Sequence, residues 1–161
     1  MTDQEYISKD GKFGVRISQT CLDEMIHFCK NSAGKETGGI LVGYYTTDQK
    51  WAVIKTVQGP TKDSMAEHTS FFRGIQGLNL LLSKLWRTRR QFYLGEWHYH
   101  PRTLPIASHH CDVPQMIDIA NSDQYQCPEP ILIILGNPVI DRWDVNVYVF
   151  PRGRNMELLT V

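Results

Sequence analysis

The sequence lacks the features that mark secreted, membrane-spanning or nucleic-acid-binding proteins. Its first residues, MTDQEYISKDGKF, show no basic stretch followed by an apolar run, so we expect no signal peptide. No apolar run approaches the length of a membrane span, since the longest candidates cover only residues 131–135 and 78–82. The 17 basic residues balance the 17 acidic ones, which leaves no overall charge to attract nucleic acid or an anionic membrane. We therefore predict no nucleic-acid and no membrane partner.

The chain also lacks any pair of cysteines at the CxxC spacing. Its four cysteines are Cys21, Cys29, Cys111 and Cys127, and we expect reduced thiols in a cytoplasmic protein. No repeat, low-complexity tract or linker divides the sequence. Its 161 residues, 42% of them apolar, suit one domain over residues 1–161 with a hydrophobic core of its own.

Patterns typical of helices and strands alternate along the chain, which predicts an α/β domain. Ser18 is placed to cap the first helix, in which Leu22, Met25, Ile26 and Cys29 share one face. Residues 58–72 are predicted to form a loop. Strands are predicted over residues 13–17, 38–45, 51–57, 91–100, 131–135 and 143–150, and helices over 18–31, 73–88 and from about residue 112 onward.

The second and third predicted helices each carry an apolar side. The third begins near Asp112, and Pro114 suits its first turn. Its apolar side consists of Met116, Ile117 and Ala120. The apolar side of the second helix consists of Ile75, Leu78, Leu82, Leu85 and Trp86.

The segment GEWHYHP, residues 95–101, is the most informative part of the sequence. Side chains at alternate positions of a strand share a face, so His98 and His100 project together. Two histidines and a carboxylate are typical of a catalytic zinc site, because they leave a fourth position open for water. An HxH pair alone is also common on solvent-facing strands, so a metal site needs further ligands. Candidates follow just beyond one loop, at Ser108, His109, His110, Cys111 and Asp112.

A second segment, ETGGILVG, places Glu36 before a glycine pair that opens an apolar strand. Glycines at these positions permit another backbone to come close. Taken by itself, the segment fits a loop glutamate beside a strand equally well.

Together these segments resemble the JAMM, or MPN-plus, metallopeptidases, whose pattern is an upstream glutamate, then HxH, seven residues and SxxD. Glu36, His98 and His100 match it, and Ser108 follows His100 after seven residues. The resemblance spans about residues 13–150. It implies a curved mixed β-sheet flanked by helices, similar to that of cytidine deaminases, and a Zn2+ ion held by the histidines and a nearby acid. It also implies that Glu36 is the catalytic base and that Ser108 hydrogen-bonds the developing oxyanion.

The sequence departs from the family pattern at the acidic ligand. Three residues after Ser108 stands Cys111, and Asp112 comes one residue later. Either the loop carries one extra residue and Asp112 binds the metal, or Cys111 binds it, or the site is empty. We favour Asp112, because loops absorb an insertion readily whereas a thiolate would change the charge at the metal. His109 and His110 are predicted to be exposed loop residues.

The resemblance implies a zinc isopeptidase that cleaves after the C-terminal tail of a ubiquitin-like modifier. Among family members, the chain is most similar to the compact bacterial isopeptidases of CBASS anti-phage systems. These remove a conjugated cGAS-like nucleotidyltransferase from its target. Metal-activated water needs no nucleophilic side chain, so a thiol alkylator is expected to leave activity intact. Glu96, which shares a strand face with His98, is a second candidate for the base.

Several alternatives stay open at this stage. A metal-free MPN scaffold that only binds partners would account for the displaced acid, and a sulfur-carrier or ubiquitin-like precursor could replace the conjugate as substrate. A zinc deaminase would need an HxE segment and a PCxxC, and Cys127 has no second cysteine after it. The basic residues Arg87, Arg89 and Arg90 suit the dipole at a helix end better than nucleic acid.

Overall fold

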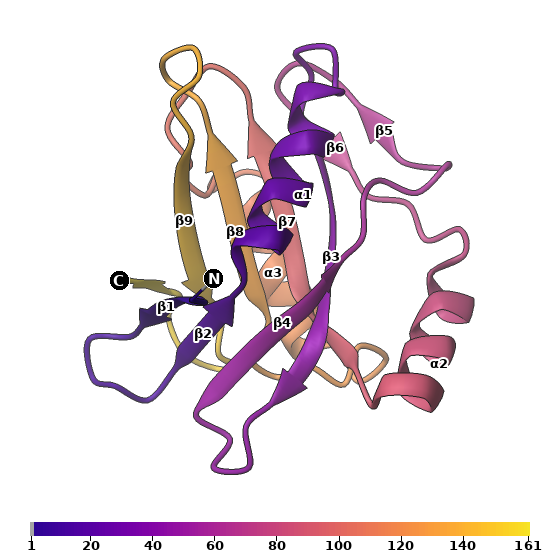
Figure 1. Cartoon of the computed structure of the whole chain (residues 1–161), viewed down its shortest axis with the longest axis vertical. Helices are drawn as coiled ribbons and strands as arrows, with labels where there is room; N and C mark the ends of the chain where they lie inside the picture. The colour runs from indigo at the N-terminus through magenta and orange to yellow at the C-terminus, as the bar shows by residue number, and fades with distance from the viewer. Residues whose placement is uncertain (1) are drawn as a thin grey trace.

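The computed structural model describes residues 2–161, in which three helices pack against one large curved sheet (Figure 1). The helices are α1 (Gln19–Lys30), α2 (Leu78–Arg89) and α3 (Asp112–Asn121). The strands are β1 (Gln4–Ile7), β2 (Gly14–Ile17), β3 (Thr37–Tyr45), β4 (Trp51–Val57), β5 (Met65–Ala66), β6 (Phe71–Phe72), β7 (Phe92–His100), β8 (Ile131–Gly136), β9 (Asp144–Val149) and β10 (Glu157–Leu159).

Eight of these strands form a mixed sheet in the order β1-β2-β4-β3-β7-β8-β9-β10. β2 pairs with β4 and β7 with β8 in parallel, whereas the other neighbours pair antiparallel. Two backbone hydrogen bonds between Ile7 and Thr160, 2.8 and 3.0 Å long, join the end of β1 to the residue after β10. The sheet is therefore curved and nearly closed, which confirms the predicted α/β class and the mixed sheet. The likeness to cytidine deaminases stays a prediction.

Each face of the sheet has its own hydrophobic core. One core packs α1 against the sheet, through Leu22, Met25 and Cys29, and it includes Trp97 and Tyr99 of β7. The other core contains Leu85 of α2 and Met116 of α3, together with side chains from the opposite face of the same strands. Figure 1 shows α1 in front of the sheet and α3 behind it. The two faces of a strand therefore meet different helices.

The first helix forms as predicted. Ser18 is its N-cap, and the Ser18 side chain accepts a hydrogen bond from the Cys21 amide over 3.2 Å. Leu22, Met25 and Cys29 are buried, which is the face that the spacing indicated. The predicted capping residue and buried side are both confirmed.

The predicted start of the second helix was wrong. The helix begins at Leu78, because Gly77 at its N-cap has a left-handed backbone with φ of 82° and the residues before it are held elsewhere. The Asp63 carboxylate accepts the amides of Ile75 and Gln76, each over 3.0 Å. Ile75 is consequently 71% exposed and not part of a buried helix face.

Parts of the predicted apolar helix sides also face solvent. Trp86 of α2 is 49% exposed, and the arginine that follows the helix, Arg90, lies over its ring. In α3 the residue Ile117 is 47% exposed, whereas Ile119 takes the buried position together with Met116. A short helix on a curved sheet buries a narrow stripe, so apolar residues one step off that stripe stay outside.

Some short strands have no counterpart in the prediction. β1 and β10 lie next to the closure of the sheet, and the predicted loop over residues 58–72 contains the two-stranded ribbon β5–β6. These strands have two to four residues each, which is too short for a recognisable alternating pattern. Among residues 2–161 no helix is long and apolar enough to cross a membrane.

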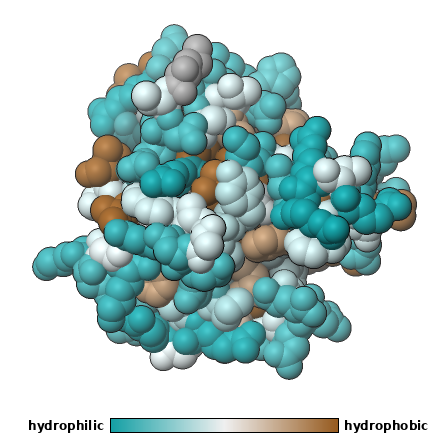
Figure 2. Space-filling model, turned by 60° about the horizontal axis from the view of Figure 1, so that its bottom comes forward, coloured by the Kyte–Doolittle hydropathy of each residue, from teal (hydrophilic) through white to brown (hydrophobic). Residues whose placement is uncertain are grey.

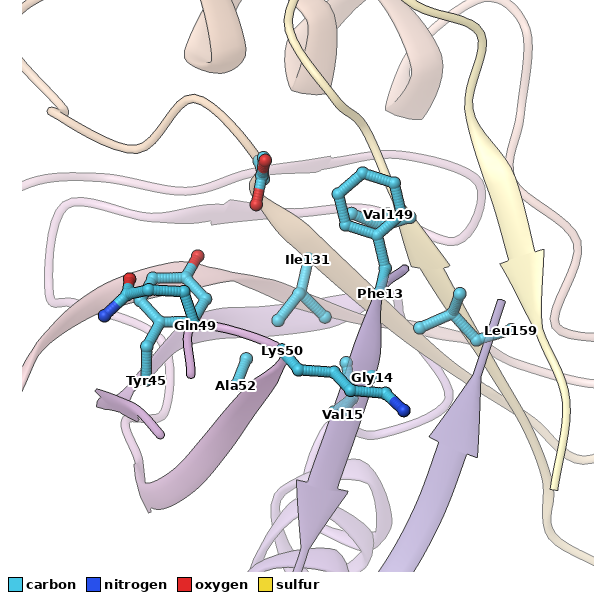
Figure 3. Close-up of a pocket in the computed structure, with 11 residues that line it drawn as sticks. Phe13, Gly14, Val15, Tyr45, Gln49, Lys50, Ala52, Ile131, Val149 and Leu159 are labelled. Atoms are coloured by element: carbon cyan, nitrogen blue, oxygen red, sulfur yellow. The ribbon is translucent and has the colours of Figure 1, made fainter. Parts of the chain in front are cut away.

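One face of the molecule is mainly hydrophilic, and the pocket near the chain ends is small. Figure 2 shows a face on which hydrophilic residues predominate and apolar ones form small separate areas. A pocket lined by Phe13, Tyr45, Ile131 and Leu159 has a volume of only about 10 Å3 (Figure 3). That volume has room for about one water molecule.

Candidate metal centre

A bulge in β7 decides which side chains of this strand face α3. In the pairing with β3, Leu41 lies opposite Gly95 and Val42 opposite Tyr93, so Leu94 has no partner. The extra residue shifts the alternation by one position. Glu96, His98 and His100 therefore share the α3 side with Tyr93, whereas Leu94 points into the α1 core.

Glycines allow the strands around this site to come close. A Cβ atom at Gly95 would collide with the Ile131 carbonyl of β8, and one at Gly38 would collide with the Trp97 carbonyl of β7. A Cβ atom at Gly39 would collide with the Gln58 carbonyl. The glycine pair in ETGGILVG therefore acts as the sequence predicted, and it brings Glu36 to the end of β7 that carries His98 and His100.

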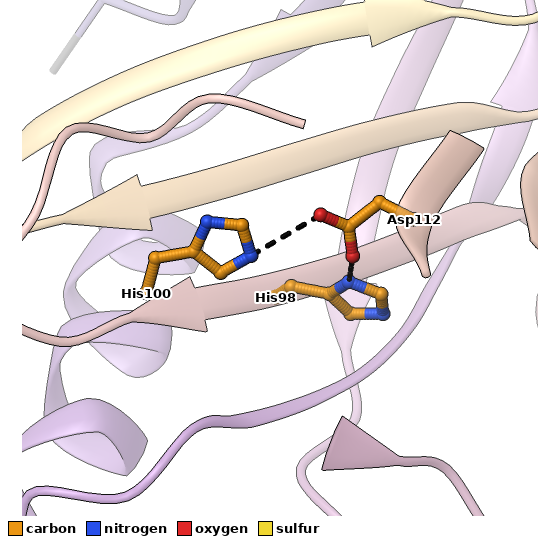
Figure 4. Close-up of side chains that lie close together, drawn as sticks. All are labelled: His98, His100 and Asp112. Atoms are coloured by element: carbon orange, nitrogen blue, oxygen red, sulfur yellow. Dashed lines mark hydrogen bonds and ion pairs between the residues drawn. The ribbon is translucent and has the colours of Figure 1, made fainter. Parts of the chain in front are cut away.

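His98, His100 and Asp112 meet between β7 and the first turn of α3 (Figure 4). His98 Nδ1 lies 2.8 Å from Asp112 Oδ1, and His100 Nε2 lies 3.2 Å from Asp112 Oδ2. One donor atom from each of the three buried side chains lies within 4.8 Å of the others. This is the separation at which the three atoms could bind one metal ion.

The extra residue in the loop is accommodated at the start of α3. Ser108 Oγ accepts the amides of Cys111 and Asp112, each over 3.1 Å, and the Ser108 amide donates to Asp112 Oδ2 over 2.8 Å. These bonds turn the Asp112 side chain toward the histidines. Cys111 is exposed, and so are His109 and His110 as expected.

The charges within the cluster stabilise an ionised Asp112. Burial disfavours the carboxylate, but the hydrogen bonds from His100 and His98 outweigh it and hold the pKa of Asp112 well below its usual range. Burial likewise disfavours a charged His100, but the hydrogen bond and charge of Asp112 raise the pKa of that imidazole. The negatively charged Asp112 carboxylate therefore lies between a ring nitrogen of His98 and one of His100.

The residues present fit a zinc ion. His98 Nε2 is buried and has no hydrogen-bond partner among the described residues, and such an uncompensated nitrogen is costly unless a cation binds near it. Two imidazoles and one carboxylate are also the donor set of catalytic zinc sites, with one position left for water or substrate.

Glu36 lies beside this cluster. It lines the same pocket as His100, Ser108 and Asp112, which has a volume of about 200 Å3. Its amide donates to the Glu67 carbonyl over 2.8 Å, which fixes the backbone just before β3. Burial raises the pKa of Glu36, although the neighbouring His100 opposes the shift, and a raised pKa suits a group that takes and returns a proton near neutral pH.

Glu96, the second candidate for the base, points elsewhere. It is fully buried, and its Oε2 accepts from Arg73 Nε and its Oε1 from the Tyr93 hydroxyl, both over 2.7 Å. Both oxygens are therefore occupied away from the pocket that Glu36 lines.

The sequence did not identify several side chains at the site. Phe71 of β6 packs edge-on against the His98 ring, with 6.0 Å between ring centres. The apolar pair Phe71 and Phe72 was visible in the sequence, but nothing there indicated which of the two turns inward. Further residues that line the pocket with Glu36 are Thr69, Thr103, Leu104, Ile106 and Gln115.

The family follows from comparison with known proteins. A model of prokaryotic homologues of the JAB domain matches residues 18–146, which include Glu36 and the whole His98–Asp112 cluster. The chain belongs to this family, and it is a hydrolase of the JAMM type. The resemblance stated from the motifs is confirmed, and zinc is the typical metal of such a site.

Two relatives and one solved structure are similar over most of the chain. A CD-NTase/cGAS isopeptidase of Enterobacter hormaechei subsp. hoffmannii is 37% identical over 94% of this chain and 83% of its own length. A probable metalloprotease of Sinorhizobium fredii is 23% identical over 76% of each chain. A solution structure of a Desulfitobacterium hafniense protein superposes with a TM-score of 0.62 at 15% identity, covering 88% of this chain and 86% of the other, and it supports the fold alone.

Proposed function

We propose that this protein is a zinc-dependent isopeptidase that releases a protein from a conjugate by hydrolysing the bond after its C-terminal tail. The observation that carries this proposal is the cluster of His98, His100 and Asp112, beside a pocket that Glu36 lines together with His100 and Asp112. The conjugated protein is a cGAS-like nucleotidyltransferase or a ubiquitin-like modifier. Support for the former is the 37% identical relative, whose name is CD-NTase/cGAS isopeptidase.

The roles of the site residues follow from their positions. His98, His100 and Asp112 would hold the zinc, and Glu36 takes a proton from the attacking water and returns it to the leaving amine. When bound, zinc supplies a Lewis acid for the scissile carbonyl and lowers the pKa of water to about 7. The raised pKa of Glu36, caused by burial, makes its carboxylate a stronger base toward the attacking water.

Ser108 has a donor left for the substrate. Its Oγ accepts two backbone amides, so its own O–H is the group that can point into the pocket. Ser108 donates this hydrogen to the oxyanion that forms on the scissile carbonyl. The positive end of α3 lies at the same place and favours negative charge there.

The surface beside the pocket suits an extended tail. A groove of about 530 Å3 shares Phe71 and Gln115 with the pocket and continues along α3 past Ile119 to Tyr125. One wall of the groove comes from β6, the second strand of a ribbon that pairs only with β5 among the described residues. A tail can pair with such a strand edge while its side chains occupy the groove.

Metal content and cleavage together test the proposal. The parent and the variants Asp112→Ala and Cys111→Ala are purified without added metal, and bound zinc per chain is measured by elemental analysis. We expect about one zinc in the parent and in Cys111→Ala, and strongly reduced zinc in Asp112→Ala. A parent that binds no zinc even after reconstitution would leave only a metal-free binding scaffold.

The substrate probe is a nucleotidyltransferase tail joined through an isopeptide bond to a lysine of a reporter protein. We expect the parent to cleave this probe and Asp112→Ala to leave it intact. The same tail in a head-to-tail fusion and a ubiquitin-like tail on the reporter are run in parallel. Cleavage of linear precursors alone would assign the enzyme to precursor processing, and would refute the isopeptidase proposal.

A further inference from the structure

A buried ion pair connects β7 to the segment that covers the metal centre. Arg73 Nε donates to Glu96 Oε2 over 2.7 Å, and both side chains are almost completely buried. Arg73 follows directly after β6, so the pair fastens the end of the β5–β6 ribbon to the strand that carries His98 and His100. We call residues 65–72 the flap.

Each of the two remaining nitrogens of the Arg73 side chain has a partner as well. Its Nη2 donates to the Tyr125 hydroxyl over 2.7 Å and its Nη1 to the Gly74 carbonyl over 2.9 Å. The Tyr93 hydroxyl donates to the second oxygen of Glu96. Burial disfavours the charge on Arg73, but Glu96 outweighs it and raises the pKa of the guanidinium, so Arg73 stays charged.

The flap touches the catalytic machinery at two other points. The Glu67 carbonyl accepts the Glu36 amide over 2.8 Å, and the Phe71 ring packs edge-on against the His98 ring. The flap therefore contacts the proposed base and a proposed metal ligand, and the adjoining Arg73 contacts the strand that carries this ligand. Apolar residues could fill the space of a buried ion pair at similar stability, so stability alone does not explain the pair.

We propose that Arg73 and Glu96 are positioning residues, whose buried ion pair holds the flap where it orients Glu36 toward the metal centre. This inference rests on the proposed role of Glu36. Neither residue lines the pocket that contains Glu36. The pair acts through the flap, on the backbone of Glu36 and on the ring of His98.

The test compares Arg73→Met, Arg73→Lys and Glu96→Gln with the parent. In Arg73→Met we expect kcat on the isopeptide probe to fall about 10- to 100-fold, because small displacements of a catalytic group have effects of this size. KM and zinc content should stay close to parent values. Arg73→Lys restores the charge beside Glu96 and should recover part of kcat, and Glu96→Gln should lose less than Arg73→Met.

Hydrogen exchange of the zinc-free protein provides a readout that does not depend on activity. The Glu36 amide is hydrogen-bonded to the flap, and the Glu67 amide is hydrogen-bonded within it. In Arg73→Met we expect both amides to lose about 10-fold or more of their protection from exchange. Amides of α1 should be unchanged.

Two controls separate positioning from general loss of stability. Arg16→Met removes a pair with Glu5 that is also 2.7 Å long but exposed, and it should change neither kcat nor exchange. Val149→Ala, in the core on the α1 side, should lower the melting temperature while kcat stays at the parent value. Both variants keep the flap contacts.

Parent-like kcat and parent-like Glu36 exchange in Arg73→Met would overturn the inference. If Arg73→Met does not fold, the same two measurements on Arg73→Lys and Glu96→Gln decide it. If the parent fails to bind zinc or to cleave the probe, the proposed function fails. Even then, parent-like hydrogen exchange of the Glu36 amide in Arg73→Met would refute the role of the ion pair, independently of the proposed function.

Discussion

The two faces of β7 differ in what they bury, although both belong to one nine-residue strand. On the α1 side Leu94, Trp97 and Tyr99 fill an apolar core. On the α3 side Glu96, His98 and His100 are just as inaccessible, yet each is bonded to a charged partner. Burial alone therefore does not distinguish the core residues of β7 from the site residues. The hydrogen-bond partners of the side chains distinguish them.

This comparison predicts separate effects for substitutions on the two sides. Changes on the α3 side should remove chemistry while the fold persists, and changes on the α1 side should remove stability while the chemistry persists.

The largest effect is expected from Glu36→Gln. The amide cannot take a proton from water, and general acid–base catalysis contributes about 10²- to 10⁴-fold, so kcat should fall by that factor with zinc content unchanged. Steady-state cleavage of the isopeptide probe and elemental analysis measure the two quantities. Glu67→Gln is the matched control, because Glu67 contacts Glu36 only through its backbone carbonyl. Equal activity of parent and Glu36→Gln would exclude Glu36 as the base.

Next in size is Trp97→Ala, on the opposite face of the same strand. The fully buried indole donates to the Gln58 carbonyl over 2.9 Å and packs against Phe28, so its loss should lower the free energy of unfolding by about 3–5 kcal/mol. Chemical denaturation measures this change. Zinc content of the folded variant should equal that of the parent, and a loss of zinc without a loss of stability would contradict the division between the faces.

Ser108→Ala should have a smaller and mixed effect, because Ser108 belongs to both the site and the scaffold. Loss of its O–H should lower kcat by about 10²-fold. Loss of the acceptor for the Cys111 and Asp112 amides should also cost about 1 kcal/mol of stability. Ser122→Ala, at the far end of α3, controls for the helix. Unchanged kcat together with lower stability would show that Ser108 only holds the start of α3 in place.

The smallest effect is expected from Cys111→Ser, which should retain parent zinc and parent kcat because the thiol is exposed and Asp112, not Cys111, groups with the histidines. Burial raises the pKa of the Cys127 thiol to about 12, which protects it from alkylation. Cys111 also lines the pocket, so a bulky alkylating reagent should inhibit the parent by obstruction and leave Cys111→Ser active. The sequence-based expectation that alkylators leave activity intact stays a prediction, and it concerns the chemical step and not obstruction of the pocket. Inhibition of Cys111→Ser by the same reagent would contradict this explanation.

Much of the fold could be predicted from local patterns. The bounds of β4 agree with the prediction to the residue, and those of β7 differ by one residue, because both strands are long and buried. Ser18 indicated the start of α1, because a serine side chain can accept a hydrogen bond from an amide in the first turn of a helix. The closure between Ile7 and Thr160 could not be predicted, since it pairs segments from the two ends of the chain through very short strands.

Residues of the candidate site could be predicted from the sequence where residue type and spacing indicate them. Glu36, His98, His100 and Asp112 were named. The structure groups the last three and places Glu36 in the pocket that His100 and Asp112 line, although the roles of all four stay predictions. Arg73 was predicted to lie in a helix, because no local sequence pattern indicates that its side chain pairs with a buried carboxylate on another strand. Ile75 was misplaced for the same reason, since Asp63 holds its amide.

The unpaired Leu94 adds one residue to β7 without adding one to its pairing with β3. Its neighbours Tyr93 and Gly95 pair with Val42 and Leu41, which are adjacent in β3, so deletion of Leu94 would leave all of these pairs consecutive. The α1 core would lose the Leu94 side chain, whereas Glu96, His98 and His100 would keep their side of the sheet. The surplus residue therefore serves the core, and the ligands of the site do not depend on it.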